Sequence, residues 1–434
     1  MSRSIRRVHA AMVTMWGREI GAVAWDDERT AANFEFTPEF IAAGLDIAPL
    51  TMPRRSGIFS FPQLPPKTFR GLPGLLADVL PDRYGNLLID LWLQQRGRTP
   101  SDFSPVERLC YIGSRGMGAL EFRPALVRAP QAATPLEVSE LADLARTVVG
   151  NRAQLMVKLD EKAKALDNII RVGTSAGGAR AKAVIAWNRS TGEVRSGQVP
   201  PPPGFEPWIL KFDGVRDETL GDPQGFGRVE YAYHRMAAEA GIEMTECRLF
   251  EEHGRAHFMT RRFDRTTANG KLHMQSLCAL AHYDFNAPGA YGYESAFDAI
   301  QRLNLGAPAV AQMYRRMVFN VLARNQDDHT RNIAFLMDQS GTWRLAPAFD
   351  VIWAYNPSGE WTNRHQMSVN GKRDEFVRAD FEAVASTFGV KKWKDILEEV
   401  TTSVRRWEEF AHSAGVDPSQ SAYIGQTHRR LPDA

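Results

Sequence analysis

The chain has 434 residues, of which 44% are hydrophobic and 24% are charged, values that exclude a disordered chain and indicate more than one packed unit. The net charge of +2 does not demand a nucleic-acid-binding surface, and no apolar run approaches the roughly 18 residues of a membrane helix. The three cysteines lie far apart without a Cys-x-x-Cys motif, so we expect neither a zinc site nor a redox pair, but a cytoplasmic protein with no membrane partner.

The first part of the chain is expected to be rich in strands. Residues 10–35 predict a hairpin followed by another strand. Residues 72–97 predict a helix that is interrupted at Pro81, and the glycine-punctuated stretch 108–123 predicts strand. Residues 125–135 are typical of a linker because Pro and Ala dominate there, so we place the first domain boundary in this stretch.

The middle of the chain combines a glycine-rich turn with short strands. Helices are expected at 136–148 and 151–166. The stretch Gly173-Thr-Ser-Ala-Gly-Gly-Ala-Arg-Ala-Lys182 then enters a strand, and a proline-rich loop leads to a second strand at 208–213. This second strand carries Lys211 among apolar neighbours.

A helix at 228–240, which carries Glu230, and strands at 246–250 and 256–263 follow. The remainder is expected to be mainly helical, interrupted by one hairpin at 333–350.

The strongest chemical signal is the stretch Asn325-Gln-Asp327-Asp-His329-Thr-Arg-Asn332, followed by Phe349-Asp350. Because a hairpin returns the chain to its start, we expect Asn332 and Asp350 at one open end, beside Asp327. Their oxygens suit Mg²⁺ bound to nucleotide phosphates, and phosphoryl transfer needs a carboxylate that accepts the hydroxyl proton. Asp327 precedes Asn332 by five residues, the interval of the protein-kinase catalytic loop. The alternative is a helix cap or a solvated loop.

The glycine-rich turn is a second signal, because glycine lets backbone N–H groups approach phosphate oxygens. The turn matches neither Gly-x-Gly-x-x-Gly nor a Walker sequence, so a plain strand turn stays open. Lys211 is expected to need an anionic partner such as an ATP phosphate, with Glu230 as a candidate holder. A lysine that extends from an edge strand into solvent is the other interpretation. The order of these parts is that of a two-lobed kinase.

Together these motifs resemble the HipA family, serine/threonine kinases that act as toxins of bacterial toxin–antitoxin pairs. The resemblance runs along nearly the whole chain. The stretches that carry it are Leu80-Pro-Asp82-Arg-Tyr-Gly85, Tyr111-Ile-Gly113 through Gly118-Ala-Leu-Glu-Phe122, Ser175-Ala-Gly-Gly-Ala-Arg-Ala-Lys182, Ile209-Leu-Lys211-Phe, Val229-Glu230, Arg262-Phe-Asp-Arg265, Asn325-x-Asp327-x-His329-x-x-Asn332 and Phe349-Asp350.

The resemblance implies a role for each motif. Asp327 would be the catalytic proton acceptor, and Asn332 and Asp350 would bind Mg²⁺. Ser175 aligns with a serine that such kinases autophosphorylate, and a phosphate of charge about −2 there cannot share the pocket with ATP. The implied ATP-binding set is Gly177, Gly178, Ala179, Arg180, Ala181, Lys182, Lys211, Arg261, Arg262, Phe263, His329, Asn332 and Asp350. Family hinges usually begin with Glu where Arg261 stands, so we expect the adenine contact to rest on backbone there.

The resemblance also implies partners: a HipB-like helix-turn-helix antitoxin that binds operator DNA, and a protein substrate such as an aminoacyl-tRNA synthetase. The predicted fold is α+β with a two-lobed, kinase-like core. It would comprise a β-rich N-terminal subdomain (1–130), a nucleotide-binding lobe (131–265) and a helical catalytic lobe (266–434). Two other functions stay open, namely a small-molecule kinase of the aminoglycoside-phosphotransferase type and a nonenzymatic operator-binding partner of an antitoxin.

Overall fold

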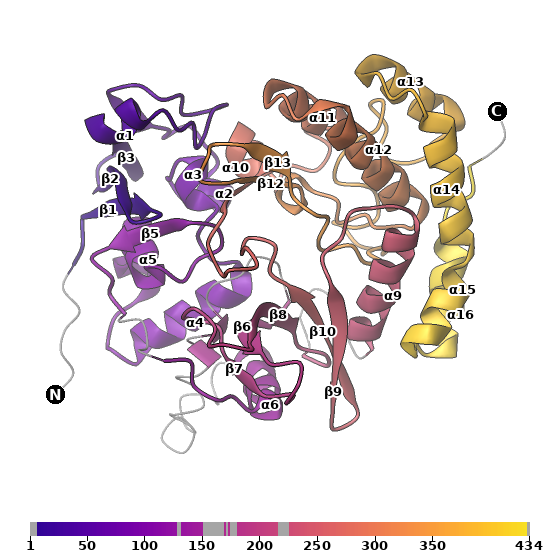
Figure 1. Cartoon of the computed structure of the whole chain (residues 1–434), viewed down its shortest axis with the longest axis horizontal. Helices are drawn as coiled ribbons and strands as arrows, with labels where there is room; N and C mark the ends of the chain where they lie inside the picture. Colours follow the sequence, from indigo (N-terminus) through magenta and orange to yellow (C-terminus); the bar gives the residue numbers. More distant parts are fainter. Residues whose placement is uncertain are drawn as a thin grey trace. The chain divides into compact units, whose positions relative to one another are not determined.

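The computed structural model describes residues 7–127, 132–150, 169–170, 172–173, 180–215 and 225–431. Helices and sheets are mixed along the chain, which agrees with the predicted α+β class (Figure 1). The chain divides into two compact units, of which the first comprises Met1–Ile47, Met52–Gly227 and Arg248–Met274. The second comprises Ala48–Thr51, Arg228–Cys247 and Gln275–Ala434. No helix within the described ranges has both the length and the apolar character needed to cross a membrane.

The first sheet of unit one is antiparallel and has the strand order β4-β3-β2-β1-β5. Its strands are β1 (Ala10–Met15), β2 (Arg18–Asp26), β3 (Ala31–Phe36), β4 (Ile58–Ser60) and β5 (Leu120–Arg123). Trp16 and Gly17 turn the chain between β1 and β2 with positive φ angles of 51° and 76°, as a two-residue hairpin turn requires. The hairpin and third strand predicted at 10–35 are confirmed.

Short helices accompany this sheet: α1 (Pro38–Ala43), α2 (Pro66–Phe69), α3 (Gly74–Ala77), α4 (Arg83–Gln94), η1 (Pro100–Asp102) and α5 (Pro105–Ile112). The strand predicted at 108–123 is wrong over its first part, because α5 extends to Ile112 and only β5 is strand. A capping box starts α5: Glu107 N–H donates to Ser104 Oγ (3.1 Å), and Ser104 N–H donates to the Glu107 carboxylate (2.9 Å).

The second sheet of unit one has the order β7-β6-β8-β10-β9. Its strands are β6 (Lys182–Trp187), β7 (Val194–Ser196), β8 (Glu206–Lys211), β9 (Cys247–Glu252) and β10 (Arg255–Arg261), and α6 (Val138–Gly150) precedes them. The strands expected after the glycine-rich turn are therefore confirmed. The helix predicted at 151–166 lies outside the described residues.

Unit two is mainly helical, as predicted. Its helices are α9 (Phe226–Glu239), which begins at the end of unit one, α10 (Leu277–Ala281), α11 (Tyr293–Arg302), α12 (Gly306–Leu322), α13 (Arg378–Phe388), α14 (Trp393–Arg405), α15 (Trp407–Ala414) and α16 (Pro418–Thr427). The predicted hairpin is formed by β12 (Ala334–Met337) and β13 (Trp343–Leu345), in a sheet of order β11-β12-β13 with β11 (His273–Ser276).

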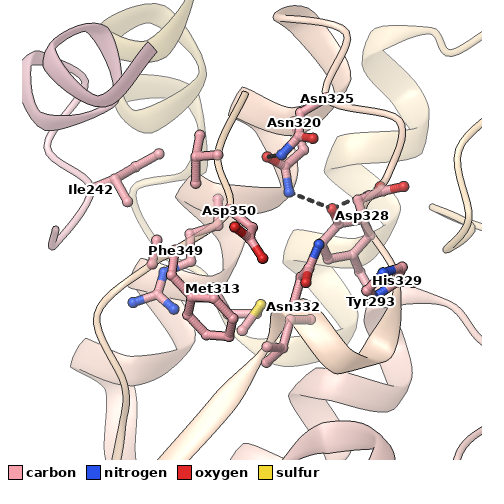
Figure 2. A pocket seen from close by; sticks show the side chains of 14 residues that line it. Ile242, Tyr293, Met313, Asn320, Asn325, Asp328, His329, Asn332, Phe349 and Asp350 are labelled. Carbon is pink, nitrogen blue, oxygen red and sulfur yellow. Dashed lines mark hydrogen bonds between the residues drawn. The ribbon is translucent and has the colours of Figure 1, made fainter. Parts of the chain in front are cut away.

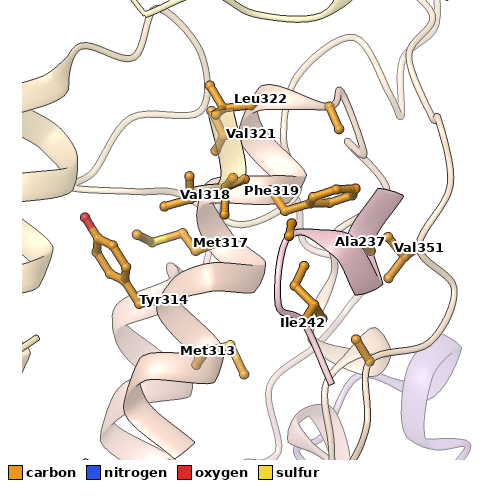
Figure 3. Packing of buried hydrophobic residues seen from close by; sticks show 14 of the residues in the cluster. Ala237, Ile242, Met313, Tyr314, Met317, Val318, Phe319, Val321, Leu322 and Val351 are labelled. Atoms are coloured by element: carbon orange, nitrogen blue, oxygen red, sulfur yellow. The ribbon is translucent and has the colours of Figure 1, made fainter. Parts of the chain in front are cut away.

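Helix α12 runs through the core of unit two. Met313, Met317, Phe319 and Val321 on this helix are fully buried and pack in one apolar cluster (Figure 3). Burying each such side chain contributes about 1.5–3 kcal/mol, so the helix is firmly held. Its C-terminal end is consequently a rigid platform for the loop that carries the candidate catalytic residues.

Candidate active site

The loop between α12 and β12 carries Asp327 and Asn332. Arg324 reverses the chain after α12 with a φ of 55°, and the turn η2 (Thr330–Asn332) leads into β12. The Asn332 side-chain amide donates to the Asp327 carbonyl oxygen at 2.9 Å, which closes the loop on itself. The amide nitrogen is used in this bond, so the amide oxygen is the atom of this side chain that can serve as a metal ligand.

Asp350 enters the same pocket from the far end of the β12–β13 hairpin. Its φ of 51° lies in the left-handed region, which is rare for residues other than glycine and is frequent at functional sites. Asn332 and Asp350 both line a pocket of about 30 Å³. Figure 2 shows the Asp350 carboxylate and the Asn332 amide facing one another there. The structure therefore brings together the two residues that the hairpin argument predicted to share an ion.

This donor set fits Mg²⁺. The cation prefers hard oxygen ligands and is usually held by one or two carboxylates together with water and phosphate oxygens. Within the described ranges, no cluster of three or more His, Cys, Asp or Glu residues could enclose a metal by itself. An amide oxygen and a carboxylate beside a small pocket match a metal that completes its shell with a nucleotide.

The Asp327 carboxylate faces solvent more than its neighbours do, with 40% of the side chain exposed. Trp361 Nε1 donates to Asp327 Oδ1 at 2.6 Å, and His329 Nε2 lies 3.8 Å from the same oxygen. Partial burial of the carboxylate raises the pKa of Asp327; His329 and the Trp361 hydrogen bond oppose this rise, whereas Asp350 adds to it. An accessible carboxylate with a raised pKa is suited to accept a proton.

Asp328, in contrast, is an internal anchor with a side chain only 1% exposed. It accepts hydrogen bonds from Tyr293 Oη (2.9 Å), His365 Nδ1 (2.7 Å) and the Gln366 backbone N–H (2.8 Å). Burial alone would raise the pKa of Asp328, but His365 and these hydrogen bonds outweigh it and lower the pKa. A carboxylate held by this many donors is unsuited to proton transfer, so the two adjacent aspartates have different roles.

The tautomer of His365 follows from its second contact. Arg429 Nη1 lies 2.6 Å from His365 Nε2, and because a guanidinium can only donate, Nε2 must be the acceptor. The ring is therefore neutral, with its proton on Nδ1 and donated to Asp328. Burial lowers the pKa of His365, in agreement with this state, although Asp328 acts in the opposite direction.

The predicted nucleotide-binding residues of unit one are only partly described. Ser175, Gly177, Gly178 and Ala179 lie outside the described residues. Arg180 lies over the Phe226 ring, 4.7 Å from its centroid, and Ala181 is buried. Lys211 is half-buried on β8, with its ammonium 5.6 Å from the centroid of Phe258. Contacts of these residues with ATP stay predictions.

Lys182 faces Lys211 across the β6–β8 pair, and its ammonium is 2.9 Å from the Asp82 carboxylate. Both members of this ion pair are almost completely buried, at 1% and 5% exposure. The aspartate of Leu80-Pro-Asp82 thus anchors the start of the strand that follows the glycine-rich turn. An ATP contact by the Lys182 backbone stays a prediction.

Replacing Asp82 by Asn is expected to lower the free energy of unfolding by about 3 kcal/mol, because a buried ammonium loses its counter-ion. Asn can still accept the Gly85 N–H hydrogen bond (2.8 Å) that caps α4, so the change isolates the ion pair. In urea denaturation, the double variant D82N/K182M should recover most of the loss. A single variant as stable as the wild type, or a double variant no better than the single, would contradict this role.

The predicted hinge residues are Arg261, Arg262 and Phe263. The Arg261 guanidinium is 3.6 Å from Glu206, while Arg262 is buried and pairs with Asp264 at 2.7 Å. The Arg262 side chain is thereby committed to the interior of unit one, and Phe263 is half-buried beside it. Adenine binding by this segment stays a prediction.

Glu230 is buried on α9 in unit two, whereas Lys211 belongs to unit one. The predicted support of Lys211 by Glu230 stays a prediction.

Several residues of the site belong to no motif that could be recognised in the sequence. Trp361, His365 and Arg429 lie beyond the catalytic hairpin, at positions that no spacing rule connects with Asp327. Tyr293 is the first residue of α11, and its hydroxyl donates to Asp328. Asn320 donates to this hydroxyl at 2.8 Å, and periodicity along α12 could have suggested its orientation toward the loop.

Two family models together match most of the chain. The HipA N-terminal domain model matches residues 11–123, and the HipA-like C-terminal domain model matches residues 174–408. A curated protein of Sinorhizobium fredii (strain NBRC 101917 / NGR234), named "Putative kinase Y4mE", is 25% identical over 157 residues, which cover 34% of this chain and 34% of that protein. The chain thus spans about a third of the length of that relative.

A solved structure extends the likeness to the whole fold. A chain of the Shewanella oneidensis MR-1 toxin–antitoxin complex of HipA, HipB and operator DNA superposes with a TM-score of 0.67. The alignment has 14% identity and covers 96% of this chain and 94% of that one. The predicted α+β, kinase-like fold is thereby confirmed, and the C-terminal model alone spans more than half of the sequence. The chain therefore belongs to the HipA family.

Proposed function

We propose that this protein is an ATP- and Mg²⁺-dependent serine/threonine-protein kinase that transfers the γ-phosphoryl group to a protein hydroxyl. The observation that carries the proposal is that Asn332 and Asp350 line one pocket, while the loop that supplies Asn332 also carries the accessible carboxylate of Asp327. The Asn332 amide donates to the Asp327 carbonyl oxygen, and the Asp327 carboxylate is close enough to interact electrostatically with Asp350. A base, two metal ligands and a small pocket are the parts that phosphoryl transfer needs.

Each residue has a defined task in this reaction. Asp327 accepts the proton of the attacking hydroxyl, because its carboxylate is the accessible one of the adjacent pair. Asn332 and Asp350 hold Mg²⁺, which when bound neutralises charge on the phosphate oxygens. Lys211 and the backbone of residues 177–182 bind the phosphates, and the hinge at Arg261 to Phe263 receives the adenine.

The family suggests the biological setting. We propose that the protein is the cytoplasmic toxin of a toxin–antitoxin pair and binds a HipB-like helix-turn-helix antitoxin, through which it reaches operator DNA. We further propose autophosphorylation at Ser175 and an aminoacyl-tRNA synthetase as the substrate. The Shewanella complex, which contains HipA, HipB and operator DNA, supports the choice of partner.

Incubation of the purified chain with γ-labelled ATP and Mg²⁺ tests the reaction. Label is expected on Ser175 and on added substrate protein, and chelation of Mg²⁺ should abolish it. Transfer to an aminoglycoside hydroxyl instead would favour a small-molecule kinase. Absence of label on any protein, together with absence of ATP binding, would refute the proposal.

A further inference from the structure

The segment between Asp350 and α13 places an indole directly on the candidate base. Trp361 Nε1 lies 2.6 Å from Asp327 Oδ1, a short distance that is typical of a hydrogen bond to an ionised carboxylate. Indole nitrogen can only donate, so the direction of this bond is fixed. The His329 ring lies near the indole, with ring centroids 6.3 Å apart, and is a second aromatic group close to this carboxylate.

This contact distinguishes the two carboxylate oxygens of Asp327. Oδ1 accepts the hydrogen bond from Trp361, and His329 Nε2 lies 3.8 Å from the same oxygen. Among the described residues, no donor hydrogen-bonds Oδ2, and the side chain is 40% exposed. Oδ2 is therefore the oxygen that can meet an incoming hydroxyl. A general base works only when the receiving atom is held within hydrogen-bond reach of the proton, so a fixed carboxylate orientation has catalytic value.

Trp361 is itself held by the network around Asp328. The Gln366 side-chain amide donates to the Trp361 carbonyl oxygen, and the Gln366 backbone N–H donates to Asp328 Oδ1 at 2.8 Å. His365, in the same short segment, donates to the other oxygen of Asp328. Residues 361–366 thus hydrogen-bond to both adjacent aspartates. Trp361 donates to the accessible carboxylate of Asp327, and His365 and Gln366 donate to the buried carboxylate of Asp328.

We propose that Trp361 is a positioning residue for the base: its indole N–H holds Asp327 Oδ1 so that Oδ2 faces the acceptor hydroxyl. The inference rests on the proposed kinase function. A purely structural tryptophan would affect stability, but it would not change kcat selectively.

Trp353 offers a matched control. It lies in the same segment after Asp350, is likewise half-buried, and its indole N–H donates at 2.9 Å to Thr427 Oγ1 at the end of α16 rather than to Asp327. Trp361→Phe and Trp353→Phe therefore remove the same kind of hydrogen bond from an indole. Only Trp361→Phe removes a hydrogen bond to the candidate base, Asp327.

In labelled-ATP assays, Trp361→Phe is expected to lower kcat on the order of tenfold, part of the roughly 100- to 10,000-fold that general-base catalysis supplies. KM for ATP should be unchanged, and Trp353→Phe should keep the wild-type kcat. Trp361→His, which returns a ring N–H, should retain more activity than Trp361→Phe. Thermal unfolding of all variants establishes that each is folded at the assay temperature.

The assays distinguish a failure of the positioning role of Trp361 from a failure of the proposed kinase function. An active wild type with an equally active Trp361→Phe would overturn the inference alone. Equal losses of kcat in Trp361→Phe and Trp353→Phe, or in Trp361→Phe and Trp361→His, would also overturn it, because the indole N–H would then have no special role. A wild type that binds no ATP and labels no protein would overturn the kinase function, and the inference with it.

Discussion

Asp327→Asn is expected to lower kcat by about 100- to 10,000-fold while binding of ATP and Mg²⁺ is retained. Asn has nearly the same shape as Asp, and its amide oxygen can still accept the Trp361 hydrogen bond, but it cannot take a proton from the attacking hydroxyl. Asn332 and Asp350 are unchanged, so the metal ligands remain in place. Labelled-phosphate transfer measures kcat, and titration calorimetry with ATP and Mg²⁺ measures binding.

The neighbouring aspartate supplies the control for this prediction. Asp328 is buried and accepts three hydrogen bonds, so Asp328→Asn should lower the free energy of unfolding, by about 1–3 kcal/mol. Asp327 is accessible, and its replacement should leave the free energy of unfolding nearly unchanged. Wild-type kcat in the Asp327 variant would show that another group is the base. A parallel loss of nucleotide binding would instead show that Asp327 contributes to holding the substrate.

The pairing of Asn332 with Asp350 could be predicted because its cause is local. A hairpin with strands of matched length must return to its origin, so the geometry depends only on the chain between the two residues. The division of roles between Asp327 and Asp328 was beyond the sequence, since it depends on which carboxylate meets Tyr293 and His365. These side chains come from other parts of unit two, and only the packed core determines their approach.

One error of interpretation has a physical cause. The stretch 108–123 contains glycines and β-prone residues, which suggested strand, but the Ser104–Glu107 capping box and Pro105 start a helix before them. The ion pair of the Lys182 side chain could not be predicted from the sequence. Its ammonium lies against Asp82, a partner about 100 positions away in sequence that no local pattern could have connected with it.

Asp264→Asn is expected to have the largest effect on stability, lowering the free energy of unfolding by about 3–5 kcal/mol. Asp264 is fully buried and is shared between Arg262 (2.7 Å) and Arg265 (2.6 Å), and it also accepts the Gly118 N–H at 2.8 Å. Burial lowers the pKa of Arg265 to about 10, so this guanidinium stays charged near neutral pH. Loss of the shared carboxylate would leave two buried cations facing each other, which urea denaturation at neutral pH would detect.

Asp143 is the matched control, because its carboxylate is also shared between two arginines, Arg255 (2.8 Å) and Arg146 (3.6 Å), but its side chain is 54% exposed. Asp143→Asn should cost less than about 1 kcal/mol, as exposed ion pairs do. An equal loss in both variants would contradict the argument from burial.

The pH dependence of the free energy of unfolding gives a further test of the ion pairs that Asp264 forms with Arg262 and Arg265. Burial alone would raise the pKa of Asp264, but Arg262, Arg265 and the hydrogen bonds outweigh it and hold the pKa far below its usual range. A carboxyl whose pKa is lowered on folding stabilises the native state above its unfolded pKa of about 3.9, and this contribution is lost as the pH falls toward the folded value. The stability difference between wild type and Asp264→Asn should therefore be constant near neutral pH and shrink below about pH 4. A difference that stays the same through this acid range would mean that the cluster is held by packing rather than by the charge of Asp264.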